Sequence, residues 1–271
     1  NTAPCIGLAS YHIHQLDQDA VCAVFPADHI IQDEEAFVDD VILAAEYAGR
    51  EDTLVTFGIP PTTPSTGYGY VQVGSAVTDT DGLFQVQAFM EKPAIDTATE
   101  YVSSGEFLWN SGMFCWSTKS IISAIRNCLP DLGESLGVIA NAEGTVEYDA
   151  ILRSEWNRIE KISIDYGVME KISNVVVIKA QFGWSDVGSW DALYDLLADG
   201  KGANVSNGDV IIMNSEGCLI YGGHKTIVAA GLKDLLVVQT PDSTLILKRG
   251  ESESVKLLVD ELTRLGRDNL L

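Results

Sequence analysis

The chain has 271 residues, 46% of them hydrophobic and 21% charged, a composition typical of a globular protein rather than a disordered one. Its 17 basic and 39 acidic residues give a net charge of −22, which argues against nucleic acid or an anionic membrane as a partner. Five cysteines without a CxxC pair, and apolar runs far shorter than the roughly 20 residues of a membrane helix, favour a cytoplasmic protein over a disulfide framework, a zinc site or a membrane span.

The first part of the chain alternates helices and strands. The spacing of apolar residues predicts helices over 4–16, 33–49, 97–104, 118–128 and 130–140, and another from Ser163 to near Lys171. Strands are predicted over 21–25, 53–59, 68–73, 83–91, 112–116 and 175–179. The run 21–25 lacks alternation, which favours a strand buried on both faces of a parallel sheet. This order is typical of a doubly wound α/β sheet with crossover helices.

After a predicted helix over 190–197 the character of the sequence changes. Short strands separated by Gly, Asn and Asp turns are predicted at 210–213, 218–221, 226–229, 235–239 and 244–247. They indicate a compact β module, β-helix-like in its regular strand spacing, which a helix over 252–265 closes. We therefore predict a domain over 1–200 and a small C-terminal module over 201–271.

Two aspartates follow predicted buried strands. Ligands of open α/β sheets bind beyond the carboxyl ends of the strands, where Asp28 and Asp186 are expected. Two carboxylates there could hold Mg²⁺, a hard cation that prefers oxygen ligands. Each aspartate could equally cap a neighbouring helix or turn.

Further polar residues lie near predicted strand ends. Gly69 lies where backbone could approach a ligand closely, although a tight turn explains it equally well. Glu91 and Lys92 pair an acceptor for sugar hydroxyls with a cation for a phosphate, although surface salt bridges look the same. Asn110 could line a pocket or form a turn, and Asp165 is explained by its place at a helix start.

Taken in order, seven segments resemble the mannose-1-phosphate guanylyltransferase family of nucleotidylyltransferases. The resemblance implies a Rossmann-like nucleotidyltransferase sheet and transfer of GMP from GTP to mannose-1-phosphate, with Mg²⁺ as the cofactor. It implies that Asp28 and Asp186 bind the metal. The segments are Asn1-Thr2-Ala3-Pro4, Pro26-Ala27-Asp28-His29, 56–59 with Gly67-Tyr68-Gly69-Tyr70, Glu91-Lys92-Pro93, 109–114, Ser163-Ile164-Asp165-Tyr166 with Glu170-Lys171, and 183–190.

The same resemblance assigns the sugar phosphate to a second group of residues. It implies that Gly69 and Glu91 hold the sugar, that Lys92 meets its phosphate, and that Asn110 and Asp165 line the pocket. Gly69 belongs to the Gly67-Tyr68-Gly69-Tyr70 segment and Asn110 to the 109–114 segment.

The chain departs from the family in two places. The glycine-rich, nucleotide-gripping segment with which family members begin does not precede Asn1, and Ser65 stands where the family more often shows glutamate. We therefore expect an N-terminally incomplete domain without robust turnover on its own. The alternatives are a nucleotidylyltransferase for another hexose-1-phosphate, or a non-catalytic sugar-phosphate sensor or regulatory subunit. Association into a homo-oligomer through an unpaired strand edge is a further expectation.

Overall fold

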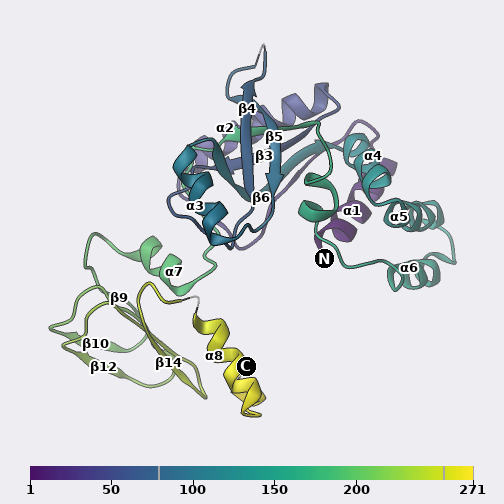
Figure 1. Ribbon diagram of the computed structural model, residues 1–271. Coiled ribbons are helices and arrows are strands. Elements are labelled where there is room, and N and C mark those ends of the chain that lie inside the picture. The colour runs from purple at the N-terminus through teal and green to yellow at the C-terminus, as the bar shows by residue number, and fades with distance from the viewer. Residues whose placement is uncertain (79, 253, 271) are drawn as a thin grey trace. The chain divides into compact units, whose positions relative to one another are not determined.

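The computed structural model describes residues 1–78, 80–252 and 254–270, which form two compact units (Figure 1). Unit 1 comprises residues 1–27 and 31–184, and unit 2 lies within 28–30 and 185–271. The predicted domains, 1–200 and 201–271, stay a prediction. The predicted closing helix includes residue 253, which lies outside the described residues.

Unit 1 is built on a mixed six-stranded sheet of order β1-β6-β3-β7-β5-β4. Among the described strands only β3 and β7 run parallel in this sheet, and the other pairs are antiparallel. The α/β class is confirmed, although the sheet is more mixed than the buried runs suggest. The strands of this sheet are β1 (Val21–Val24), β3 (Leu54–Ile59), β4 (Tyr70–Ala76), β5 (Leu83–Met90), β6 (Phe107–Ser117) and β7 (Val175–Lys179). Two further strands, β2 (Ile30–Ile31) and β8 (Trp184–Ser185), have two residues each and are not part of it.

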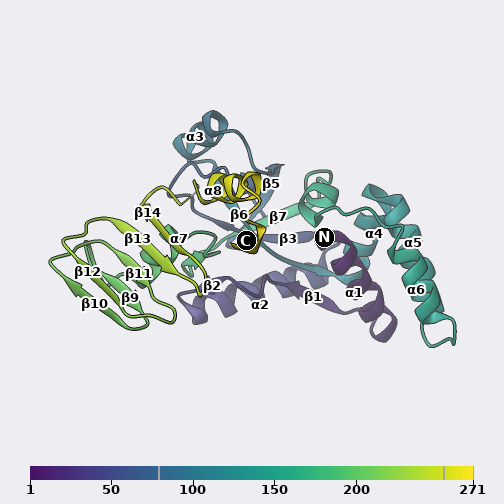
Figure 2. The same ribbon diagram turned by 90° about the horizontal axis from the view of Figure 1, so that it is seen from below.

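Helices cover both faces of this sheet (Figures 1 and 2). Side chains alternate along a strand, so Val175 and Val177 enter the core beneath α1, α4 and α5, while Val176 and Ile178 enter the core beneath α2 and α3. The central strand β7 is therefore apolar throughout its buried length. The helices are α1 (Thr2–Leu16), α2 (Glu34–Arg50), α3 (Ile95–Ser104), α4 (Thr118–Cys128) and α5 (Pro130–Ala142).

The strand predicted over 21–25 does not have the predicted environment. Strand β1 is half-buried and pairs antiparallel with β6, and it is the last described strand at its end of the sheet. Its side chains pack against both cores, Val21 on one face and Cys22 and Val24 on the other, but they stay half-buried because an edge strand lacks a neighbour on one side. The prediction of a strand inside a parallel sheet was therefore wrong. Self-association through its outer edge stays a prediction.

Two helical segments differ from the predicted ones. Helix α6 (Tyr148–Trp156), which packs beside α5 (Figures 1 and 2), was not predicted; Tyr148 and Leu152 pack against the core, but none of its described residues is fully buried. The helix predicted after Ser163 is a single π-helical turn, η1 (Asp165–Met169). The Ser163 hydroxyl accepts the backbone N–H of Tyr166 at 3.3 Å, but the N-cap residue of the turn is Ile164 and not the predicted Ser163.

Unit 2 is a short stack of parallel β coils. Val205, Leu219 and Leu236 occupy equivalent positions in β9, β11 and β13, and β10 pairs in parallel with β12. This repetition of strands confirms the β-helix-like prediction. The elements are α7 (Trp190–Leu197), β9 (Val205–Asn207), β10 (Val210–Met213), β11 (Leu219–Tyr221), β12 (Ile227–Ala230), β13 (Leu235–Gln239), β14 (Thr244–Lys248), α8 (Ser254–Arg264) and the 3₁₀ turn η2 (Asp268–Leu270).

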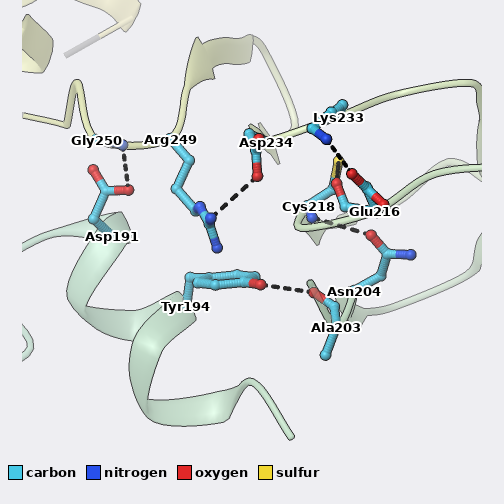
Figure 3. A network of polar contacts seen from close by, with 10 residues as sticks. All are labelled: Asp191, Tyr194, Ala203, Asn204, Glu216, Cys218, Lys233, Asp234, Arg249 and Gly250. Carbon is cyan, nitrogen blue, oxygen red and sulfur yellow. Dashed lines mark hydrogen bonds and ion pairs between the residues drawn. The ribbon is translucent and has the colours of Figure 1, made fainter. Parts of the chain in front are cut away.

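A polar network joins α7 to the coils of unit 2 (Figure 3). The Arg249 guanidinium lies over the Tyr194 ring, 4.2 Å from its centroid, and pairs with Asp234 at 3.1 Å. Asp191 accepts the backbone N–H of Gly250 at 2.7 Å, and the Tyr194 hydroxyl donates to the Ala203 carbonyl at 2.8 Å. These contacts fix the helix against the turn that follows β14.

Among the described helices, none is both long enough and apolar enough to span a bilayer.

Candidate functional site

A bulge in β6 aims Asn110 at the candidate site. The ladder between β3 and β6 shifts register beside Gly58, and Gly112 has φ of +71°, a conformation that favours glycine. The Ser111 hydroxyl donates to the Phe57 carbonyl at 2.6 Å and secures the bulge. The Asn110 Oδ1 atom accepts the backbone N–H of Gly112 at 3.2 Å, so its amide nitrogen faces away from the bulge.

The Asn110 amide nitrogen donates to Asp165 Oδ1 at 2.8 Å. Asp165 opens the π-helical turn, a form that often occurs at functional sites. Burial raises the pKa of Asp165, and the hydrogen bond from Asn110 opposes this rise. Asn110 and Asp165, both predicted to line one pocket, are thus in direct contact.

Glu91, at the end of β5, presents a carboxylate that is not fully satisfied. Its side chain is 10% exposed, and within the described residues its buried Oε2 atom has no hydrogen-bond partner. Its Oε1 atom lies 3.6 Å from Lys92 Nζ. Burial raises the pKa of Glu91 to about 6, the charge of Asp165 adds to the rise, and Lys92 opposes it. A buried acceptor without a partner is costly unless a ligand satisfies it.

Gly69 provides the space for this carboxylate. A Cβ atom built on Gly69 would overlap Glu91 Oε2 and come within 3.2 Å of Asn110 Cβ. The Gly69 carbonyl also accepts the backbone N–H of Asn110 at 2.8 Å. Gly69, Glu91, Asn110 and Asp165 therefore form one continuous cluster, with Lys92 beside it.

Lys92 has a strained backbone. Its φ is +46°, and it precedes Pro93, which disfavours helical conformations of either hand. The Glu170 Oε1 atom accepts the backbone N–H of Glu91 at 2.9 Å, immediately before this strained residue. The sequence singled out Glu170 only as part of the Glu170-Lys171 segment, without a role of its own. No local pattern could reveal a contact between residues 79 positions apart.

Ser65 has a structural role in the turn before β4. The Ser65 hydroxyl accepts the backbone N–H of Gly67 at 3.1 Å, and its carbonyl accepts the Tyr70 hydroxyl at 2.8 Å. Beyond this turn, the Tyr68 ring lies against Trp109 and Trp184, with centroid distances of 4.9 and 5.5 Å. Ser65 thus shapes the loop that leads to Gly69.

Asp28 and Asp186 belong to unit 2, where His29 lies near both. Burial lowers the pKa of His29, and the charges of Asp28 and Asp186 both oppose this shift. Asp186 Oδ1 accepts the backbone N–H of Gly188 at 3.1 Å, and the intervening Val187 has φ of +48°, which is rare for a β-branched residue. A strained turn therefore presents the Asp186 carboxylate.

The donor chemistry of this aspartate pair fits a hard divalent cation. Over residues 1–78, 80–252 and 254–270, no group of three or more His, Cys, Asp or Glu side chains is arranged to hold a metal. Mg²⁺ commonly uses only one or two protein carboxylates and completes its shell with water and substrate phosphates. Asp28 and Asp186 match that mode of binding and not a site made wholly of protein ligands.

Comparisons with known families cover nearly the whole chain. The family described as nucleotidyl transferase matches residues 1–201, and the family described as MannoseP isomerase/GMP-like beta-helix domain matches residues 208–262. The second match agrees with the stacked coils of unit 2. Enzymes of the first family generally use a divalent metal.

Individual relatives agree with these matches. Mannose-1-phosphate guanylyltransferases of Escherichia coli and Klebsiella pneumoniae are 41% and 39% identical over 97% of this chain. The chain spans 56% of the length of each of these relatives. A solved structure from Thermus thermophilus, described as a mannose-1-phosphate geranyltransferase, has a TM-score of 0.84 and 30% identity, over 97% of this chain and 75% of that one.

Proposed function

Because the chain belongs to the nucleotidyl transferase family, we propose that it serves the transfer of GMP from GTP to mannose-1-phosphate, giving GDP-mannose and pyrophosphate. The names of its relatives support this choice of substrates. The cluster around Glu91 is the proposed sugar-phosphate site, and Asp28 with Asp186 is the proposed metal site.

The observation that carries the proposal is the buried, unpartnered Oε2 atom of Glu91. A carboxylate oxygen in that position accepts hydrogen bonds from sugar hydroxyls without competition from a protein donor. Gly69 allows the carboxylate to occupy this position, because a Cβ atom at residue 69 would overlap Oε2. A neutral apolar ligand would leave this oxygen unsatisfied.

The remaining residues of the cluster would contact different groups of the ligand. The Lys92 side chain is exposed and positively charged, which suits the phosphate of the sugar. The Asn110 amide and the Asp165 carboxylate orient one another and offer a donor and an acceptor to the hydroxyls. Lys92 is the proposed catalytic cation, because its ammonium group would contact the phosphate that attacks GTP.

Asp28 and Asp186 would hold Mg²⁺ through carboxylate oxygens. When bound, the ion would neutralise charge on the substrate phosphates. This contribution matters in a chain of net charge −22, whose average field repels phosphate groups. The strained turn at Val187 fixes the Asp186 carboxylate in advance of binding.

The proposed reaction requires alignment and no protein nucleophile. A phosphate oxygen of mannose-1-phosphate attacks the α-phosphorus of GTP. The new P–O bond forms as the bond from that phosphorus to the bridging oxygen breaks, and pyrophosphate leaves with the electron pair. Glu91, Asn110 and Asp165 would restrict the sugar while Lys92 stabilises its phosphate, so the chain lowers the barrier by orientation and charge.

Calorimetric titration of the purified chain with mannose-1-phosphate and glucose-1-phosphate, each with Mg²⁺, tests the sugar site. We expect mannose-1-phosphate to bind more tightly, and Glu91→Gln to weaken this binding. Equal binding of the two sugars would favour a transferase for another hexose phosphate. No binding of either would overturn the proposal.

Two further proposals concern turnover and location. Turnover by this chain is tested by the release of pyrophosphate from GTP and mannose-1-phosphate, with Asp28→Asn as the matched inactive control. All five cysteines are free thiols, which supports a reducing cytoplasm as the compartment.

A further inference from the structure

We infer that Glu170 is a positioning residue, whose side chain holds the Glu91–Lys92 segment in the conformation that receives the sugar phosphate. This assignment rests on the proposed function of the cluster. Glu170 is not one of the residues proposed to touch the ligand, and it acts through the backbone of Glu91.

The contact that carries the inference is a charge-assisted hydrogen bond. Glu170 Oε1 accepts the backbone N–H of Glu91 at 2.9 Å, where β5 has ended and its ladder no longer fixes the chain. The backbone N–H of Glu170 donates to the Asp165 carbonyl at 3.0 Å. Glu170 is therefore tied to the same turn that presents Asp165 to Asn110.

The π-helical turn thus contacts both strands that contribute to the cluster. At its start, Asp165 accepts the Asn110 amide, and just after its end Glu170 accepts the Glu91 N–H. The spacing of five residues between Asp165 and Glu170 lets their side chains contact β6 and the end of β5 respectively. An α-helical turn would offer the two carboxylates with a different relative rotation.

Backbone strain explains why this anchor is needed. Lys92 adopts φ of +46° directly before Pro93, a combination that neither residue favours. Such a conformation persists only where neighbouring contacts over-determine it. The hydrogen bond to the preceding N–H is one such contact, because it fixes the peptide from which Lys92 turns.

Capping of the π-helical turn does not explain the position of the Glu170 carboxylate. The backbone of Glu170, not its side chain, makes the hydrogen bonds that end the turn. The side chain instead accepts the backbone N–H of Glu91, just after β5. Its charge also acts on the cluster: Glu170 raises the pKa of Glu91 and of Asp165, while Lys92 lowers both. The neutral Asn110 amide is the facing group contributed by β6.

Two variants separate the hydrogen bond from the charge. Glu170→Ala removes both, whereas Glu170→Gln removes the charge and keeps an oxygen acceptor. Glu46→Gln is the matched control, because Glu46 is an exposed carboxylate of the same unit whose partner is Arg50 on its own helix. Mannose-1-phosphate affinity is measured by calorimetry between pH 5 and 8, and the pKa of Glu91 by carboxyl NMR.

We expect Glu170→Ala to weaken mannose-1-phosphate binding by about five- to tenfold at pH 8, from loss of one hydrogen bond at the site. Glu170→Gln should stay within about twofold of wild type at pH 8. Both variants should lower the pKa of Glu91 from its value of about 6, so that binding persists to lower pH. Glu46→Gln should change neither quantity.

Wild-type affinity in Glu170→Ala, or equal losses in the Ala and Gln variants, would overturn the positioning role and leave the proposed function intact. Absence of mannose-1-phosphate binding by the wild-type chain would overturn the proposed function, and the role with it. A melting temperature close to wild type confirms that each variant is folded.

Discussion

The Asn110 amide and the Asp165 carboxylate, 55 residues apart in the sequence, are joined by a 2.8 Å hydrogen bond. The bond links the bulge of β6 to the π-helical turn, two irregular features that are distant in the sequence. It also leaves the half-buried Asp165 with a donor that partly offsets the cost of its burial. The cluster is thus stabilised by the same groups that are proposed to bind the ligand.

Asn110→Asp should destabilise the chain, and more so at pH 8 than at pH 4. The substitution removes the donor and places a second carboxylate against Asp165, whose pKa is already raised by burial. We expect a loss of about 1–3 kcal/mol in the free energy of unfolding at pH 8, measured by urea titration. Asn110→Ala removes the donor without adding charge, so its loss should vary less with pH. Equal stability of Asn110→Asp and wild type at pH 8 would contradict this account.

The stability of the chain should fall as pH rises from about 4.5 to about 6. The folded-state pKa of Glu91 is about 6, above its ordinary 4.5, so in this window the folded chain binds more protons than the unfolded one. The slope of unfolding free energy against pH is therefore negative, with a contribution of up to about 2 kcal/mol from this group.

Glu91→Gln isolates the contribution of this carboxylate. Asp40, whose pKa burial also raises to about 6, retains its own part of the slope in the variant. Urea titrations of both chains at pH 4, 5, 6 and 7 should show a difference that grows with pH in favour of the variant. A difference that is constant with pH would mean that Glu91 titrates normally.

Gly69→Ala should impair ligand binding more than folding. The added Cβ overlaps Glu91 Oε2, the far end of a flexible side chain, which can move aside at little cost to stability. Moving it removes the proposed acceptor, so mannose-1-phosphate affinity should fall by about tenfold to a hundredfold. The change in unfolding free energy should stay below about 1 kcal/mol.

Gly67→Ala is the matched control for this substitution. Its added Cβ would meet only Ser65 Oγ at 3.5 Å, an ordinary contact, so calorimetry should show unchanged affinity. If both alanine variants bound mannose-1-phosphate like the wild type, Gly69 would be a turn residue and nothing more.

Several parts of the cluster were predictable because their signals are local. Glu91 and Lys92 end a predicted strand beside a proline, and Asn110 lies two residues before a glycine that the bulge requires. Most helices followed from apolar periodicity, and the central strand Val175–Lys179 followed from an unbroken apolar run, whose alternate side chains enter the two cores.

Other parts depend on contacts that no local pattern encodes. The anchor from Glu170 to Glu91 spans 79 positions and involves a backbone N–H, which carries no sequence signal. The half-burial of β1 depends on its place in the sheet, and its composition resembles that of a central strand. Strand ends led us to expect Asp28 and Asp186 near one another, but not the position of His29 near both, and their role in metal binding stays a proposal.

Arg249→Ala should loosen unit 2 without affecting unit 1. The guanidinium lies 4.2 Å from the centroid of Tyr194 and pairs with Asp234, so the substitution removes a cation–π contact and a partly shielded ion pair (Figure 3). Together these contacts are worth about 1–2 kcal/mol. Hydrogen exchange followed by mass spectrometry should show faster exchange in peptides covering 190–250 and unchanged exchange in the sheet of unit 1.

Arg264→Ala is the control, since Arg264 pairs with Glu261 on its own exposed helix α8, and it should leave both regions unchanged. Exchange in Arg249→Ala that matched Arg264→Ala would mean that Arg249 contributes nothing measurable, and that α7 is held by its other hydrogen bonds and by its apolar contacts with Leu219 and Leu236.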